Sequence, residues 1–188
     1  ANVSGSANRV YRHDRLTGET RLVVTSSDDV SNNGSCTYSA ISSDGRYVAF
    51  IGNAGSLLSE PLSTGIAAFR KDMETGELTL VSRTSDGAPA QAAGFIGISG
   101  DGASIVFSSD DALLPGAPHT LQVYLANLTD GTIIGASRRS DGTWANDTCV
   151  TARIDRLGRR VAFLSTATNL LATPTTGPRD AFVFDRID

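Results

Sequence analysis

Side chains that commonly carry catalysis are scarce in this 188-residue chain. Its histidines are His13 and His119 alone, and no serine stands in a Gly-x-Ser-x-Gly nucleophile motif. A Ser-His-Asp triad or a histidine-based metal site therefore has little to draw on. Most carboxylates fall in turn sequences, where Asp is favoured for its hydrogen bonds to the backbone. We predict no catalytic residue, no metal site and no cofactor, and hence a protein that is not an enzyme.

Two side chains in polar loops are candidates for ligand binding. Trp144 is the one tryptophan of the chain and follows Ser140-Asp141-Gly142. An aromatic ring in such a loop can anchor a protein partner or stack on a sugar, although a ring that covers one end of the fold would suit the same position. His119 is the second candidate, and its alternative is an ordinary loop histidine.

Composition and charge restrict the partners. The formal net charge is -4, and Lys and Arg are scattered along the chain, which argues against nucleic-acid binding. No apolar run approaches the roughly 20 residues needed to cross a bilayer, so we expect no membrane insertion. The abundance of Gly, Ser, Thr, Asp and Asn is typical of short strands joined by tight turns.

The elements that position these side chains form a repeat of about 57 residues. Its marker is a turn with glycine followed by an apolar segment that ends in Phe, and it occurs at 43–50, 100–107 and 156–163. The turn glycines Gly45, Gly102 and Gly158 lie 57 and 56 residues apart. A fixed period of this length is typical of a stacked or radial array.

Each period contains four segments that we interpret as short antiparallel strands. The first strands are expected at 38–42, 95–99 and 150–154, and the second strands at 47–51, 104–108 and 160–164. The third strands carry Tyr11, Phe69, Tyr124 and Phe182, and the fourth strands are expected at 20–25, 77–82 and 132–137. Four short antiparallel strands per period describe one blade of a β-propeller, in which the repeated residues serve the core and the turns.

The repeat also resembles a known family. Ser-x-Asp-Gly-x-x-Val-Ala-Phe at 42–50, followed by an aromatic strand that ends in Asp-x-x-Thr-Gly at 72–76, is similar to the TolB-type WD-like propeller repeat of bacterial envelope and secreted proteins. The resemblance covers the chain from about Arg9 to Asp185 and implies a propeller, usually outside the cytoplasm, that serves in binding. The third copy has Arg156-Leu157 before its glycine, which leaves the type of that turn open.

The repeat divides the chain into a single array of about three blades. We expect a partial blade at 1–33, blades at 34–90 and 91–145, and a partial blade at 146–188. Three blades cannot close a ring, because propellers use roughly four to eight. Two chains would close a six-bladed homodimer; the alternative is that further blades belong to a longer chain.

The two cysteines occupy the same position in the first and third copies. Cys36 and Cys149 each lie nine residues before the turn glycine of their copy. In a six-bladed dimer these copies would be neighbours, so an intermolecular Cys36–Cys149 disulfide is one hypothesis. The other is a pair of buried thiols on innermost strands.

These observations favour a non-enzymatic recognition or scaffold module. We expect it to act outside the cytoplasm of a bacterium, in the periplasm or secreted, and to bind a protein or carbohydrate partner through its propeller loops. One alternative is the propeller domain of a prolyl-oligopeptidase-like hydrolase whose catalytic domain lies elsewhere. Another is a structural subunit that assembles with itself.

Overall fold

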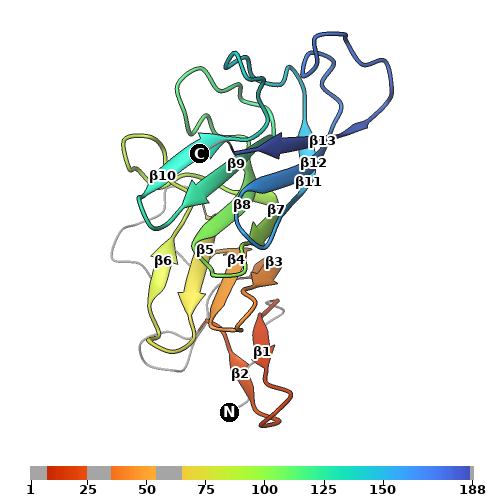
Figure 1. Cartoon of the computed structure of the whole chain (residues 1–188). Helices are drawn as coiled ribbons and strands as arrows, with labels where there is room; N and C mark the ends of the chain where they lie inside the picture. The colour runs from red at the N-terminus through yellow and green to blue at the C-terminus, as the bar shows by residue number, and fades with distance from the viewer. Residues whose placement is uncertain (1–7, 25–34, 54–64, 187–188) are drawn as a thin grey trace.

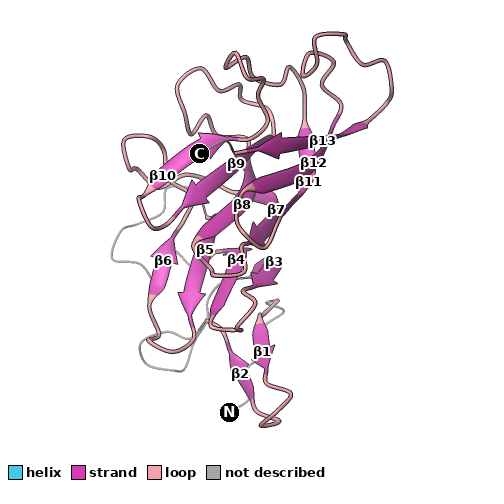
Figure 2. Ribbon diagram, in the orientation of Figure 1, coloured by secondary structure: helices cyan, strands magenta, loops and turns pink. Residues whose placement is uncertain are grey.

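The chain is built of strands and turns. The computed structural model describes residues 8–24, 35–53 and 65–186, and no helix occurs within these ranges (Figure 2). The strands form four antiparallel sheets, which follow one another along the molecule from the N-terminal hairpin to the C-terminal sheet (Figure 1). The predicted all-β class and the partial propeller are confirmed.

Two of the sheets are complete four-stranded blades, whose strands are neighbours in the same order as in the chain. The first contains β3 (Cys36–Ile41), β4 (Tyr47–Gly52), β5 (Ala67–Asp72) and β6 (Leu78–Leu80). The second contains β7 (Ala93–Ile98), β8 (Ser104–Ser109), β9 (Gln122–Asn127) and β10 (Thr132–Gly135). A hairpin of β1 (Tyr11–His13) and β2 (Thr20–Leu22) precedes them, and a three-stranded sheet of β11 (Cys149–Ile154), β12 (Arg160–Ser165) and β13 (Asp180–Asp185) follows.

A pair of stacked aromatic rings lies at the centre of each larger sheet. The phenylalanine that ends the repeat marker faces the aromatic residue of the third strand directly across the ladder. The pairs are Phe50–Phe69, Phe107–Tyr124 and Phe163–Phe182, with ring centroids 5.4, 6.0 and 5.7 Å apart. Such cross-strand pairs stabilise a sheet beyond the area that they bury. These six rings therefore serve the core, as predicted, whereas Tyr11, at the same position of the N-terminal hairpin, is 55% exposed and does not.

The hydrophobic core lies between sheets. One cluster joins Ile51 and Ala68 of the first blade to Phe107 and Tyr124 of the second. A second cluster joins the second blade to the three-stranded sheet, and a third packs Val23 and other residues of the N-terminal hairpin region on the first blade. A single small sheet cannot bury both of its faces, so each blade depends on its neighbours.

The turns between first and second strands keep one geometry in all three copies. Their glycines have φ of 72° to 74°, a conformation that glycine adopts without strain. In the first copy the Asp44 carboxylate accepts the Ser42 hydroxyl at 2.6 Å and the Arg46 N–H at 3.0 Å. In the third copy Asp155 takes the place of that serine and accepts two backbone N–H groups itself, from Arg159 at 2.7 Å and Arg160 at 3.1 Å. One carboxylate thus replaces the Ser-Asp pair, and the turn that the sequence left open is the same turn.

These turns also connect one blade to the next. The Ser43 N–H donates to the Gly100 carbonyl at 2.9 Å, and the Gly100 N–H donates to the Arg156 carbonyl at 2.8 Å. The three residues occupy the same position of the repeat. Backbone hydrogen bonds therefore set the spacing between neighbouring blades at the end of the array where these turns lie.

Two of the fourth strands, β6 and β10, are shorter than predicted, because a serine side chain takes over from the ladder. The remaining predicted fourth strand, 20–25, ends outside the described residues. The Ser82 hydroxyl accepts the Ala68 N–H at 3.0 Å and donates to the Ala90 carbonyl at 2.8 Å. Ser137 accepts the Val123 N–H in the same way at 2.9 Å. The chain leaves the sheet at these buried serines, so β6 and β10 end before them.

Candidate functional site

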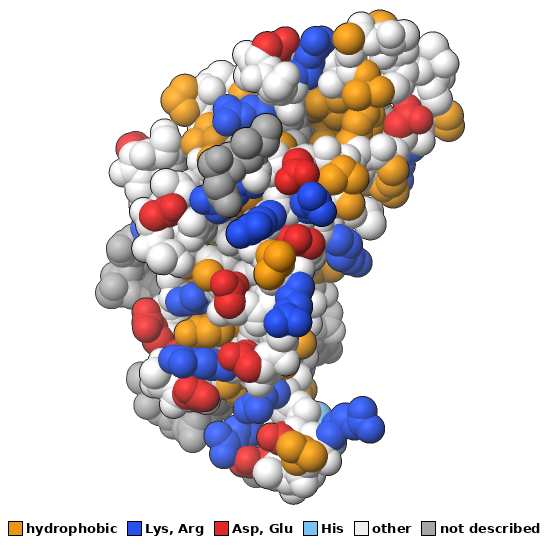
Figure 3. Space-filling model, in the orientation of Figure 1, with side chains coloured by type: hydrophobic (Ala, Val, Ile, Leu, Met, Phe, Trp, Pro, Cys, Tyr) orange, Lys and Arg blue, Asp and Glu red, His pale blue; other side chains and the backbone are white. Residues whose placement is uncertain are grey.

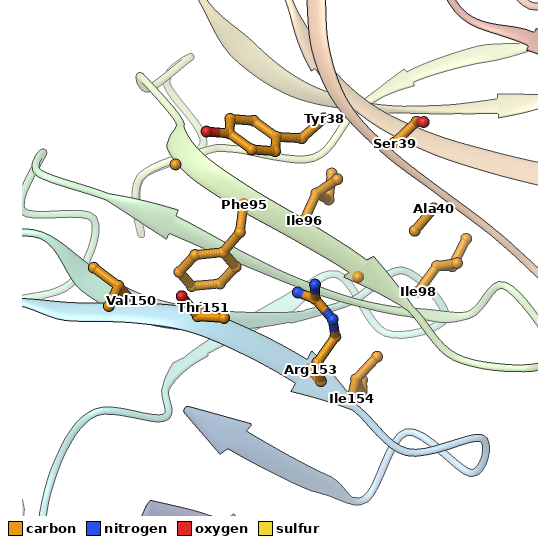
Figure 4. A pocket seen from close by; sticks show the side chains of 12 residues that line it. Tyr38, Ser39, Ala40, Phe95, Ile96, Ile98, Val150, Thr151, Arg153 and Ile154 are labelled. Atoms are coloured by element: carbon orange, nitrogen blue, oxygen red, sulfur yellow. The ribbon is translucent and has the colours of Figure 1, made fainter. Parts of the chain in front are cut away.

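The three innermost strands, β3, β7 and β11, lie side by side and line a hollow of about 590 Å³, which we call the half-channel (Figure 4). Its lining is formed by Tyr38, Ser39, Ala40, Gly94, Phe95, Ile96, Gly97, Ile98, Val150, Thr151, Arg153 and Ile154. Volumes of roughly 300–1,000 Å³ are typical of small-ligand sites. The fold thus brings residues from three copies of the repeat to one surface.

The lining is mostly apolar and contains one charged side chain. Tyr38 is 47% exposed and supplies an aromatic ring, with Phe95 below it as a nearly buried second ring. Gly97 leaves no room for a larger side chain, because a Cβ there would lie 2.9 Å from Val106 Cγ1. The charged residue is Arg153, which reaches from β11 toward β7 (Figure 4).

The Arg153 guanidinium has no ion pair with any carboxylate in the ranges that the structure describes. Its Nη1 donates to the Ala152 carbonyl at 2.9 Å, and the side chain is exposed to the half-channel. Four of the five N–H donors of such a group remain available to a ligand. A carboxylate or phosphate could accept two of them at once.

The backbone beside Arg153 is strained. Thr151 has φ of 54°, the one positive φ of a non-glycine residue in the described ranges. The register of β11 against β12 shifts between Val150 and Arg153, so Thr151 belongs to a β-bulge. A β-branched residue in this conformation costs about 1–3 kcal/mol. The register also shifts in β3 and β7, so the bulge itself belongs to the repeated fold.

Trp144 lies outside the half-channel and packs into the fold. Its ring is part-buried, 5.7 Å from the Tyr124 ring, and Arg138 lies over its face with Cζ 5.9 Å from the ring centroid. Gly135 packs on the ring so closely that an added Cβ would lie 2.1 Å from Trp144 Cη2. The structure therefore gives the ring a packing role, and a binding role stays a prediction.

The histidines are apart from the half-channel as well. His119 is exposed in the connection between β8 and β9. His13 Nδ1 lies 2.8 Å from Thr20 Oγ1 on the surface of the N-terminal hairpin. No cluster of three or more His, Cys, Asp or Glu side chains with metal-binding geometry is found among the described residues.

Both cysteines are buried within the core. Cys36 begins β3 and belongs to the cluster under the N-terminal hairpin, whereas Cys149 begins β11 and belongs to the cluster between the last two sheets. Cys149 Sγ lies 3.2 Å from Ser165 Oγ, and burial raises the pKa of its thiol. An intermolecular disulfide would have to expose these sulfurs first, and it stays a prediction.

The face that Figure 3 shows carries charges of both signs. Figure 3 shows Lys and Arg side chains interspersed with Asp and Glu over the visible face. None of the described residues forms a helix long and apolar enough to cross a membrane.

Comparisons with known proteins place this geometry in a fold family. No family model matches the chain, and no curated protein matches it significantly. Among solved structures, a putative TolB from Agrobacterium tumefaciens matches with a TM-score of 0.59 and 15% identity, over 97% of this chain and 55% of that one. TolB from Acinetobacter baumannii matches with a TM-score of 0.52 and 16% identity, over 95% and 35%.

The chain has a TolB-like propeller fold. Oligogalacturonate lyase from Vibrio parahaemolyticus shares it, with a TM-score of 0.55 and 15% identity over 95% of this chain and 42% of that one. Identities this low show the fold alone. The TolB-like chain spans between 35% and 55% of the length of these structures.

Sequence reasoning missed Arg153, although a signal was present. The corresponding positions of the other copies hold Ala40 and Gly97. Repeated residues serve the fold, so the position where one copy departs from small residues to a charged one marks a specialised site. Comparing the copies position by position along the innermost strand would have found it.

Proposed function

We propose that the TolB-like chain is a non-enzymatic recognition module that binds a carboxylate-bearing segment of a protein or an acidic carbohydrate in the half-channel. The observation that carries the proposal is Arg153, a cation with no ion pair in the described ranges, on an apolar surface with the Tyr38 and Phe95 rings. Aromatic rings take the flat face of a sugar or an apolar side chain, and the guanidinium takes the anion. The lining contains the hydroxyls of Tyr38, Ser39 and Thr151 but no His, Asp, Glu, Lys or Cys that would activate one of them as a nucleophile.

We place the module outside the cytoplasm, in the periplasm or secreted. The TolB-type repeat in the sequence and the likeness to two TolB structures support this location. Localisation of the full-length protein by cell fractionation would test it.

The last sheet supports contact with a further blade. Val183 is 68% exposed on β13, whereas Leu125, at the same position of the second blade, is 1% exposed because it packs on the three-stranded sheet. Apolar side chains are visible at the same end of the molecule in Figure 3. The exposed face of β12 and β13 is thus the counterpart of a face that is buried between blades.

Light scattering distinguishes the two sources of that blade. A dimer that Val183→Asp converts to a monomer would identify a second copy of the chain. A wild-type monomer would exclude the homodimer and leave further blades of a longer chain as the partner.

The recognition function is tested by isothermal titration with two probes, an oligogalacturonate and a glutamate-rich peptide with aromatic residues. Arg153→Gln is expected to lower the affinity for the probe that binds about 10- to 100-fold, because the variant loses a hydrogen bond between charged groups. Arg156→Gln is the matched control, because Arg156 is exposed in the turn that follows β11 and does not line the half-channel. Absence of binding by both probes, or equal affinities of the two variants, would refute the proposal, and shortening of the oligosaccharide would refute its non-enzymatic part.

A further inference from the structure

A second hollow lies on the outer side of the array, between β5–β6 of the first blade and β9–β10 of the second. This outer crevice has a volume of about 620 Å³. Its walls include Leu114, Ala126, Leu128 and Ile133, which pack on the cluster between the two blades. It shares no lining residue with the half-channel.

Arg70 forms part of the crevice wall and is held in place on two sides. Its Nη1 donates to the Gly102 carbonyl at 3.1 Å, and its Cζ lies 4.6 Å from the centroid of the Tyr47 ring. Stacking and a backbone hydrogen bond together fix a guanidinium plane. Arg70 is therefore a preorganised group.

One donor of this group is buried without a partner. Arg70 Nε is shielded from solvent and has no hydrogen-bond acceptor among the described residues. No carboxylate of those residues pairs with Arg70 either, while Glu77 and Arg83 are the other charged groups of the wall. A buried N–H without an acceptor is costly, and so is a part-buried cation without a counter-charge.

The repeat shows that the fold does not require this cation. The second blade has Leu125 at the position of Arg70, and that leucine is 1% exposed within an apolar cluster. An aliphatic side chain thus satisfies the next blade interface, although the N-terminal hairpin again has an arginine, Arg12, at this position. Arg70 contributes a hydrogen bond and a stacking contact to the blade interface, and the terminal N–H groups that these contacts leave over could serve a ligand.

We propose that the outer crevice binds a small carboxylate with an apolar body, of the size of a medium-chain acid. The carboxylate accepts from Arg70, and the apolar body lies along Leu128 and Ile133. Charge complementarity comes from Arg70, and the exposed carboxylate of Glu77 opposes the ligand from the rim. The proposal is independent of the half-channel.

Octanoate, octanol and octylamine are suitable probes, because they share one apolar chain and differ in charge. In ¹H–¹⁵N spectra of the wild-type protein, octanoate is expected to shift the amides of Leu128 and Ile133, whereas octylamine leaves them unchanged. Octanol is expected to bind at least tenfold more weakly than octanoate, because it lacks the charge-assisted hydrogen bond. Equal binding of octanol and octanoate, or shifts confined to other parts of the chain, would overturn the proposal.

Variants locate the site. Arg70→Gln is expected to weaken octanoate binding about tenfold, and Glu77→Gln to strengthen it severalfold. Arg12→Gln is the matched control, since Arg12 occupies the position of Arg70 in the N-terminal hairpin and lies outside the crevice. Equal affinities of Arg70→Gln and Arg12→Gln would also overturn the proposal. If Arg70→Gln does not fold, the comparison of octanoate with octanol on the wild-type protein still tests whether the crevice binds a carboxylate.

Discussion

Two glycines of the second blade separate the effect of backbone conformation from the effect of close packing between blades. Gly102 and Gly131 both have φ of 74°. A Cβ on Gly131 would meet no atom within 4 Å, whereas a Cβ on Gly102 would lie 2.2 Å from Cδ2 of Tyr47 on the preceding blade. Gly131→Ala therefore adds only backbone strain, and Gly102→Ala adds the same strain together with a steric clash.

The structure gives the size of each effect. A left-handed conformation costs an L-residue about 1–2 kcal/mol, and overpacking a dense interface costs about 1–3 kcal/mol more. Tyr47 cannot easily move, because Arg46 and Arg70 both contact its ring, with Cζ atoms 4.9 and 4.6 Å from the centroid. The smaller conformational freedom of alanine in the unfolded chain affects both variants equally and cancels in their difference. We expect Gly102→Ala to be less stable than Gly131→Ala by about 1–3 kcal/mol.

Urea unfolding, followed by the fluorescence of the single tryptophan, measures both free energies of unfolding under identical conditions. Tyr47→Ala should reduce the difference between the two glycine variants, because the contacts with Cδ2 and Cγ disappear while that with Cβ at 2.9 Å remains. Equal stabilities of Gly102→Ala and Gly131→Ala would refute the packing argument.

Three further outcomes are expected. Hydrogen bonds from Arg46 are the main reason why the pKa of Asp72 is lowered, so this carboxylate stabilises the fold above its unfolded pKa of about 3.9 and the stabilisation is lost as the pH falls toward the lower folded value. In denaturant titrations, the free energy of unfolding of Asp72→Asn should accordingly fall less steeply below about pH 4 than that of the wild type. An equally steep fall in both proteins would contradict this. The Cys149 thiol should not react with an aromatic disulfide reagent in the native protein, because burial raises its pKa, and rapid labelling or a disulfide-linked dimer on non-reducing gels would show that it is accessible. Gly135→Ala should displace the Trp144 ring, shift its emission to longer wavelength and cost about 1–3 kcal/mol, whereas an unchanged emission spectrum would show that the ring is not packed there.

The fold was predictable because the repeat encodes it several times over. Each copy supplies a glycine turn and an aromatic pair, so a departure in one copy, such as Asp155 in place of serine, does not hide the pattern. The lengths of the fourth strands were less predictable. They depend on whether a serine such as Ser82 turns its hydroxyl into the ladder, and an alternating pattern of residues does not show this.

The candidate site was harder to predict, because it depends on which strands become neighbours. Arg153 lies 113 residues after Ala40, yet both line the half-channel. Trp144 stands in a polar sequence, and the contacts of Gly135, Tyr124 and Arg138 with its ring become visible only in the structure. Polarity of the local sequence was therefore a poor guide to exposure, and comparing the copies is what draws attention to Arg153.

The sequence repeat and the hydrophobic cluster do not coincide in this protein. One period of about 57 residues makes one blade, but each hydrophobic cluster is composed of the facing halves of two blades. A blade excised alone would carry two half-cores and no whole one. If one repeat is added or removed inside the row, every remaining hydrophobic cluster still lies between two blades, and only the number of clusters changes. When such a row of blades closes into a ring, the outer faces of the first and last blades pack together and form one more hydrophobic cluster. Ring closure therefore enlarges the core without adding residues.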